Sequence, residues 1–180
     1  PNDFDQVADI IMEKKIDMVI VGPEAPLVEG IVEHFQNREG YSHVMVIGPG
    51  QEAAQLEGSK SFAKEFMGRN NIPTAAYKEF KKAEIENALE YIRKRDLPIV
   101  IKADGLAAGK GVVICQNHDE AEKELKAMLE EARFGKASEK VIIEEFLEGR
   151  EFSVFVLTDG KNFKILPVAR DYKRAGEGDT

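Results

Sequence analysis

The sequence predicts an α/β fold, in which a partial doubly wound parallel sheet is followed by a smaller α+β lobe. Near the start, apolar runs at residues 17–22 and 44–47 both lead into a Gly-Pro pair, and a helical pattern separates them. Strand, helix and strand of this length indicate a right-handed crossover between buried parallel strands. Further along, runs at 98–104, 112–115 and 141–143 predict an antiparallel sheet, because a glycine-rich loop joins the first two directly.

Helical periodicity accounts for the segments around the first two strands. An apolar stripe over residues 7–11 predicts a helix, with Asp3 or Asp5 as its N-cap. A second helix is predicted over residues 27–35, where apolar residues recur at every fourth position. Ser59 has the side chain and the position of an N-cap, and we expect a third helix to follow it.

The rest of the chain continues the alternation of helices and strands. Amphipathic patterns over residues 85–92 and 121–129 predict two helices, and Asn117 is the expected cap of the second. Residues 151–167 are typical of a hairpin that turns at Asp159-Gly160.

Composition excludes several classes of function. The 180 residues include 33 acidic and 25 basic side chains, and the formal net charge of −8 argues against a nucleic-acid partner. No apolar run approaches the roughly 20 residues that span a bilayer, which argues against a membrane partner. The single cysteine, Cys115, excludes an internal disulfide framework and favours a reducing, cytoplasmic compartment.

The loop between the runs 98–104 and 112–115 has the composition of an anion-binding segment. Gly105, Gly109 and Gly111 permit close approach of the backbone, and successive amides in such a loop can bind an anion. The Gly-x-x-x-Gly-Lys spacing, with neither Ser nor Thr after the lysine and a strand next, excludes a Walker A loop and a Rossmann turn. We interpret the loop as a phosphate-binding flap, with a plain hairpin connection as the alternative.

Two lysines add positive charge to this loop. Lys110 lies within it, and Lys102 lies in the preceding strand among apolar residues. A lysine in an apolar strand must face solvent or meet an anion, because burial of an unpaired ammonium is costly. Next to the glycine loop, Lys102 favours the phosphate interpretation.

Two further segments have both a functional and an ordinary interpretation. Residues 144–151 follow an apolar strand, where backbone groups can hydrogen-bond an adenine edge and Glu151 can accept from ribose hydroxyls; a solvated turn is the alternative. Residues 22–27 end a parallel strand and open a helix, where α/β sheets bind ligands and anions. An ordinary strand-to-helix turn explains residues 22–27 equally well.

Across essentially its whole length the chain resembles the glycinamide ribonucleotide synthetases, or phosphoribosylamine–glycine ligases, of the ATP-grasp superfamily. The segments that carry the resemblance are residues 22–28, 55–60, 101–112, 144–147 and 171–174. The third and fourth segments are general ATP-grasp features, whereas the first two are more specific to this ligase. The resemblance implies that ATP phosphorylates the carboxylate of glycine. The amine of 5-phosphoribosylamine then attacks glycyl phosphate in the second step of de novo purine synthesis.

The resemblance also implies roles for individual residues. Lys60 and Lys102 are expected to contact the phosphates of ATP as catalytic residues. The implied nucleotide-binding set adds Gly105, Gly109, Lys110, Gly111, Glu144, Glu145, Phe146, Leu147 and Glu151. The implied substrate-binding set is Gly22, Pro23, Glu24, Pro26, Leu27, Asp171 and Lys173.

The family's domain pattern implies that the chain is part of a longer, monomeric protein. Residues 1–73 correspond to the end of the N-terminal, pre-ATP-grasp domain, 74–148 to the small ATP-grasp lobe, and 149–180 to the start of the second lobe. The resemblance places the family's Mg²⁺ (or Mn²⁺) ligands beyond Thr180, so we expect no metal site in this chain and no ligase activity from it in isolation.

Three other interpretations stay open. One is another ATP-grasp carboxylate–amine ligase, such as a carboxylase or a D-alanine ligase, which would share the loop and residues 144–147. Another is a non-catalytic nucleotide-binding module, and the last is a structural fragment that binds nothing well.

Overall fold

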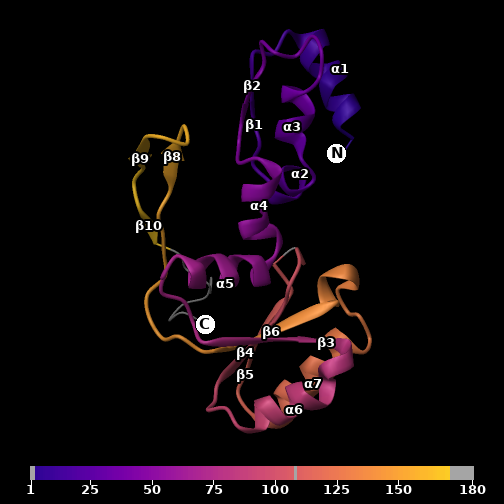
Figure 1. Cartoon of the computed structure of the whole chain (residues 1–180), viewed down its shortest axis with the longest axis vertical. Coiled ribbons are helices and arrows are strands. Elements are labelled where there is room, and N and C mark those ends of the chain that lie inside the picture. The colour runs from indigo at the N-terminus through magenta and orange to yellow at the C-terminus, as the bar shows by residue number, and fades with distance from the viewer. Residues whose placement is uncertain (1–2, 108, 171–180) are drawn as a thin grey trace, which may run out of the picture. The chain divides into compact units, whose positions relative to one another are not determined.

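The computed structural model describes residues 3–107 and 109–170 of the chain (Figure 1). The chain forms two units, residues 1–146 and residues 147–180. The described helices all belong to the first unit, and the described part of the second contains four short strands. Within the described residues, no helix has both the length and the apolar character needed to cross a membrane.

The first part of the larger unit is built around two parallel strands. Its elements are α1 (Phe4–Lys14), β1 (Met18–Ile20), α2 (Glu24–Val28), α3 (Ile31–Gln36), β2 (Met45–Ile47) and α4 (Gln51–Gly58). β1 and β2 pair in parallel, with Met18 opposite Met45. Asp3 caps α1 by accepting hydrogen bonds from the N–H groups of Asp5 and Gln6, so the predicted helix and its cap are confirmed.

Two details of this part differ from the expectation. The single helix predicted over residues 27–35 is wrong: α2 and α3 are separate helices, because Gly30 adopts a left-handed conformation with φ of 91°. The prediction that these parallel strands are buried on both faces is also wrong. Val19 packs against the hydrophobic core, but Met18 and Ile20 on the other face are 50% and 73% exposed, because the described residues leave that face to solvent.

The second part of the larger unit is an antiparallel sheet with helices. Its elements are α5 (Lys60–Arg69), β3 (Tyr77–Lys81), α6 (Ile85–Arg93), β4 (Ile99–Ala103), β5 (Val112–Cys115), α7 (His118–Leu129) and β6 (Lys140–Glu145), with short 3₁₀ turns at Lys82–Glu84 and Gly135–Ser138. The strands lie in the order β3-β6-β4-β5, and every neighbouring pair is antiparallel. Ser59 caps α5 and Asn117 caps α7, as predicted.

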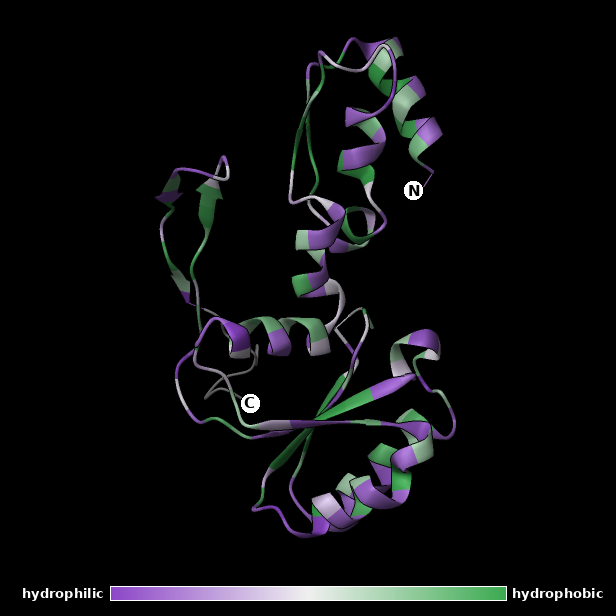
Figure 2. Ribbon diagram, viewed as in Figure 1, coloured by the Kyte–Doolittle hydropathy of each residue, from purple (hydrophilic) through white to green (hydrophobic). Residues whose placement is uncertain are grey.

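The two faces of this sheet have different surroundings. α6 and α7 cover one face (Figure 1), where Ile101, Cys115 and Ile143 are buried in the hydrophobic core. Figure 2 shows hydrophilic and hydrophobic residues alternating around these two helices, in agreement with their predicted amphipathic character. Because side chains alternate along a strand, Lys102 and Glu144 point to the opposite face, on the side of α5.

The second unit contains a hairpin at the predicted place. Its strands are β7 (Phe152–Ser153), β8 (Val156–Thr158), β9 (Phe163–Ile165) and β10 (Ala169–Arg170), paired as β8 with β9 and β7 with β10. Gly160 supplies the left-handed turn residue, with φ of 86°. Asp159 accepts hydrogen bonds from the N–H groups of Asn162 and Lys161, which lower its pKa to about 2.

Candidate functional site

The glycine loop, residues 105–111, joins β4 to β5 as a flap between antiparallel strands. A hydrogen bond of 2.8 Å from Ala103 N to Gly111 O closes its base. Gly109 has a left-handed conformation, with φ of 75°. At Gly111 an added Cβ would lie 2.7 Å from the Cβ of Ala107, so the tight return into β5 needs a glycine. The strand–loop–strand setting that excluded a Walker A loop is confirmed.

Lys102 lies at the end of β4, immediately before this loop. Its ammonium lies 2.8 Å from Oε2 of Glu144 on the neighbouring strand β6, and the lysine side chain is 27% exposed. Of the two outcomes expected for a strand lysine, the structure therefore shows contact with an anion. The remaining exposure leaves part of Lys102 accessible from outside the protein.

Lys60 reaches the same place from the first turn of α5. Its ammonium donates hydrogen bonds to the carbonyl oxygens of Ala103, Asp104 and Gly105, at 2.8, 3.3 and 3.1 Å. Burial lowers the pKa of Lys60, an effect that the charge of Lys102 reinforces and that of Asp104 opposes. Lys60 and Lys102, the two lysines expected to contact phosphates, are thus close enough for the charge of one to affect the pKa of the other. Lys60 also fixes the start of the glycine loop.

Asp104 is a residue of the candidate site that sequence reasoning missed. Its carboxylate accepts hydrogen bonds from Ser61 N at 2.7 Å and from the hydroxyl of Ser59 at 3.1 and 3.2 Å. It therefore caps the N-terminus of α5 from a distant point in the chain, and ties that helix to the glycine loop. No local pattern marks such a cap, because the capping residue lies more than forty residues after the residues that it caps.

Lys64 is the second residue that was missed. Its side chain is 6% exposed, and its ammonium donates hydrogen bonds to Thr74 Oγ1 at 2.8 Å and to Ala75 O at 3.1 Å. It also lies 3.3 Å from Oε1 of Glu144, within ion-pair distance. One signal was available: Lys64 follows Lys60 by four residues, so the two share a face of α5.

The segment after β6 forms one wall of a small cavity. Glu144, Glu145 and Phe146 line a space of about 210 Å³ together with residues 95–99. Two hydrogen bonds with Ala76 hold Glu145 in place. Glu145 N donates to Ala76 O at 3.0 Å, and Ala76 N donates to the carboxylate of Glu145 at 2.8 Å. Phe146 is 36% exposed. Leu147 and Glu151 belong to the second unit, and their predicted roles in nucleotide binding stay a prediction.

The predicted substrate turn, residues 22–27, lies at the start of α2. Gly22, Pro23 and Glu24 are exposed, and Pro23 is the N-cap residue. Leu27 is 8% exposed and belongs to the hydrophobic core of the first part, so its side chain supports the turn. Asp171 and Lys173 lie outside the described residues.

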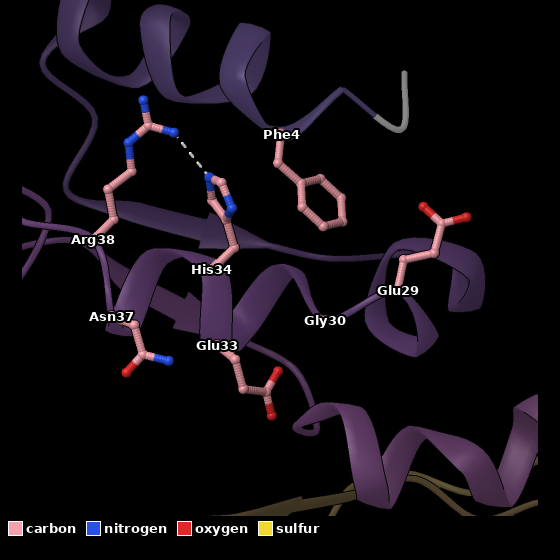
Figure 3. A pocket seen from close by; sticks show the side chains of 7 residues that line it. All are labelled: Phe4, Glu29, Gly30, Glu33, His34, Asn37 and Arg38. Atoms are coloured by element: carbon pink, nitrogen blue, oxygen red, sulfur yellow. Dashed lines mark hydrogen bonds between the residues drawn. The ribbon is translucent and has the colours of Figure 1, made fainter.

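Another hollow in the first unit contains none of the predicted site residues. Figure 3 shows its lining, which is Phe4, Glu29, Gly30, Glu33, His34, Asn37 and Arg38. Nη1 of Arg38 lies 2.9 Å from Nε2 of His34, and Arg38 also forms an ion pair with Asp5 that lowers the pKa of that carboxyl. None of the residues predicted to bind a ligand lines this hollow. The glycine loop, at which the predicted Lys60 donates its hydrogen bonds and which Lys102 directly precedes, is therefore the stronger candidate site.

The charges around the glycine loop suit a polyanion and not a metal ion. Lys64 and Lys102 lie within ion-pair distance of one carboxylate, that of Glu144, and the charge of Asp104 acts on Lys60. Within residues 3–107 and 109–170, no group of three His, Cys, Asp or Glu side chains is placed to hold a metal ion. Phosphate groups are the anions that lysines and glycine-loop amides bind together.

Comparison with known proteins shows to which family the chain belongs. The family models of phosphoribosylglycinamide synthetase match residues 1–57 (N domain) and 58–180 (ATP-grasp (A) domain). The phosphoribosylamine–glycine ligases of Pasteurella multocida and Pseudomonas aeruginosa are 48% and 49% identical to the chain, over 99% and 98% of its length and 40% of theirs. The crystal structure of the Thermotoga maritima enzyme of that name matches with a TM-score of 0.67 and 42% identity, over 75% of this chain and 34% of that one.

The two family matches meet between residues 57 and 58, just before the last residue of α4, and together they cover the chain. The chain spans about two fifths of the length of the curated relatives it matches. The matches and the mixed α/β structure lead to one assignment: the chain belongs to the phosphoribosylglycinamide synthetase family and contains part of its ATP-grasp domain.

Proposed function

We propose that the full-length protein carrying this sequence is an ATP-dependent ligase that joins glycine to 5-phosphoribosylamine. Its products are ADP, phosphate and glycinamide ribonucleotide, and glycyl phosphate is the intermediate. The observation that carries the proposal is the position of Lys102, which comes directly before the glycine loop, affects the charge of Lys60 and has its ammonium 2.8 Å from Glu144. The relatives named phosphoribosylamine–glycine ligase support the choice of substrates.

The residues near the glycine loop suit the transfer of a phosphoryl group. In our proposal Lys102 and Lys60 place positive charge where negative charge moves from ATP to the glycine carboxylate. Lys110 and the amides of Gly105, Gly109 and Gly111 close over the phosphates. Closure of the loop excludes water, which would otherwise hydrolyse the acyl phosphate.

The remaining predicted residues are assigned to binding. We propose that the backbone of residues 144–147 meets the adenine edge, at the cavity of about 210 Å³ that Glu144, Glu145 and Phe146 line. Glu151 would accept from the ribose hydroxyls, and residues 22–27 would bind phosphoribosylamine, with Asp171 and Lys173 on the substrate side. Mg²⁺ or Mn²⁺, which assists phosphoryl transfer by neutralising phosphate charge, would be held by residues other than those described.

The proposed arrangement of domains follows the same family pattern. Residues 1–73 would belong to the substrate-binding domain with its doubly wound sheet, 74–148 to the small ATP-grasp lobe, and 149–180 to the second lobe. We propose a monomeric enzyme that acts in the cytoplasm.

The test is a measurement of ADP release by the full-length protein. We expect release only when glycine and 5-phosphoribosylamine are both present, together with ATP and a divalent metal ion. ADP release driven by bicarbonate or by D-alanine instead of glycine would assign the protein to another ATP-grasp activity. The 180-residue chain alone is expected to release no ADP with both substrates, and measurable turnover by it would contradict that expectation.

A further inference from the structure

Lys64 has no place in the predicted site, yet its side chain is only 6% exposed and its ammonium lies within ion-pair distance of Glu144, the partner of Lys102. It belongs to a lysine–glutamate cluster, which we define as Lys64, Lys102 and Glu144. Oε1 of Glu144 lies 3.3 Å from Lys64 Nζ and Oε2 lies 2.8 Å from Lys102 Nζ, so one carboxylate lies between two ammonium groups. Because the side chain of Glu144 is only 5% exposed, water does little to screen the charge of its carboxylate from the two ammonium groups.

The two lysines of this cluster differ in how they are held. Lys64 is fixed by the hydroxyl of Thr74 and the carbonyl of Ala75, and 6% of its side chain is exposed. Lys102 has 27% of its side chain exposed and lies at the start of the glycine loop. Lys64 is therefore anchored away from any ligand, whereas Lys102 is the member that a ligand can reach.

The charge of the cluster follows from simple counting. Two ammonium groups and one carboxylate leave one positive charge, and the accessible carrier of that charge is Lys102. Without Lys64 the cluster would be neutral, and the carboxylate of Glu144 would hold Lys102 in a one-to-one ion pair. A neutral pair attracts a phosphate much less than a cluster with a net positive charge does.

The hydrogen-bond geometry supports this division of roles. Lys64 Nζ is within ion-pair distance of Glu144 Oε1, but that oxygen accepts no hydrogen bond from the described residues. Its interaction with Lys64 is therefore mainly one of charge. The hydrogen bonds of Lys64 to Thr74 and Ala75 set the distance between the two charges, so their positions are fixed before any ligand binds.

We propose that Lys64 is a positioning residue that neutralises Glu144 and thereby leaves the charge of Lys102 available to the phosphates of a nucleoside triphosphate. The inference rests on the proposed function of Lys102 and deepens it. Lys64 itself does not touch the nucleotide. Its effect on affinity depends on the presence of the carboxylate at position 144, which distinguishes this role from a purely structural one.

The experiment is a mutant cycle on the full-length protein, read out by calorimetric titration with ATP and, separately, with adenosine. We expect Lys64→Met to weaken ATP binding about tenfold, because Glu144 then holds Lys102 in a one-to-one ion pair, while adenosine binding changes by less than about twofold. Adding Glu144→Gln should return ATP affinity to within about threefold of wild type, because the neutral amide no longer competes for Lys102.

A comparison of Glu144→Gln with the Lys64→Met/Glu144→Gln double variant keeps the test decisive even if Lys64→Met alone does not fold. The two should bind ATP with affinities within about threefold of each other, because Lys64 acts only through the carboxylate. The matched control is Lys140→Met, which removes a lysine of the same sheet that is also 27% exposed and ion-paired, with Glu79 at 3.1 Å. That variant should keep its ATP affinity.

Three results would overturn the inference. One is a folded Lys64→Met variant that binds ATP as wild type does. Another is an equal loss of ATP and adenosine binding that Glu144→Gln does not repair. The third is a tenfold loss caused by Lys64→Met in the Glu144→Gln background. In each case wild-type ATP binding would leave the proposed function standing, whereas wild-type protein that fails to bind ATP would overturn the proposed function and this inference together.

Discussion

Replacement of Asp104 by alanine should destabilise the larger unit through the N-terminus of α5. The carboxylate accepts a hydrogen bond of 2.7 Å from Ser61 N and a weaker one from the Ser59 hydroxyl at 3.1–3.2 Å. A charge-assisted hydrogen bond contributes about 1.5–3 kcal/mol, and a lost N-cap costs about 0.5–2 kcal/mol. Because Asp104 is only partly buried, we expect a loss of about 2 kcal/mol in the free energy of unfolding.

The assay is urea unfolding of the chain followed by far-ultraviolet circular dichroism, with thermal unfolding in parallel. A loss of about 2 kcal/mol corresponds to a decrease in Tm of roughly 4–8 °C for a chain of this size. Asp104→Asn keeps an acceptor and should lose about half as much. Asp3→Ala removes an exposed cap that serves only its own helix, and is the control with the smaller effect.

Two results would refute this reasoning. One is an Asp104→Ala variant whose unfolding free energy lies within about 0.5 kcal/mol of wild type, the range of an ordinary surface substitution. The other is strict additivity with Ser59→Ala, because residues that share a hydrogen bond should show a coupling energy in a double-mutant cycle.

Four further substitutions are expected to report on backbone conformation, packing and burial. Gly109→Ala should lower the free energy of unfolding by about 1 kcal/mol, because φ of Gly109 is 75°. Gly68 lies inside α5 with open space around it, so Gly68→Ala should raise that free energy by about 0.5–1 kcal/mol. The urea midpoints of the two variants should shift in opposite directions. Leu125→Ala removes a fully buried side chain between α7 and the sheet and should cost about 2–5 kcal/mol by the same assay, and a loss below about 1 kcal/mol would contradict its burial. Burial raises the pKa of Cys115 to about 11. Because the thiol of the unfolded chain loses its proton at lower pH than the folded one, the free energy of unfolding should fall as pH rises from about 9 towards 11. Cys115→Ala should make the free energy of unfolding depend less on pH in this range.

Local patterns predicted most of the elements, because the forces that form them are local. Caps at Asp3, Ser59 and Asn117 were predicted correctly, since an N-cap depends on a side chain and the two or three residues that follow it. The buried faces of α6 and α7 followed from helical periodicity for the same reason. Where one glycine changed the backbone, at Gly30, periodicity predicted one helix where there are two.

The sequence indicated some residues of the candidate site, but not the contacts that connect them in the structure. Lys102 and the glycine loop were identified because a lysine in an apolar strand and clustered glycines are unusual in sequence. Asp104 and Lys64 were missed because their partners, in α5 and in β6, are brought to them only by the tertiary fold. A buried ion pair between distant residues leaves no periodic signal along the chain.

The most direct test of the central claim is ATP affinity with Lys102 changed. Calorimetric titration should compare wild type, Lys102→Met and the control Lys140→Met, which removes an equally exposed, ion-paired lysine from the same sheet. If Lys102 holds the phosphates, Lys102→Met should bind ATP at least about tenfold more weakly, and Lys140→Met should stay within about twofold of wild type. Equal ATP affinity in wild type and Lys102→Met would contradict the assignment of a phosphate site to Lys102 and the glycine loop.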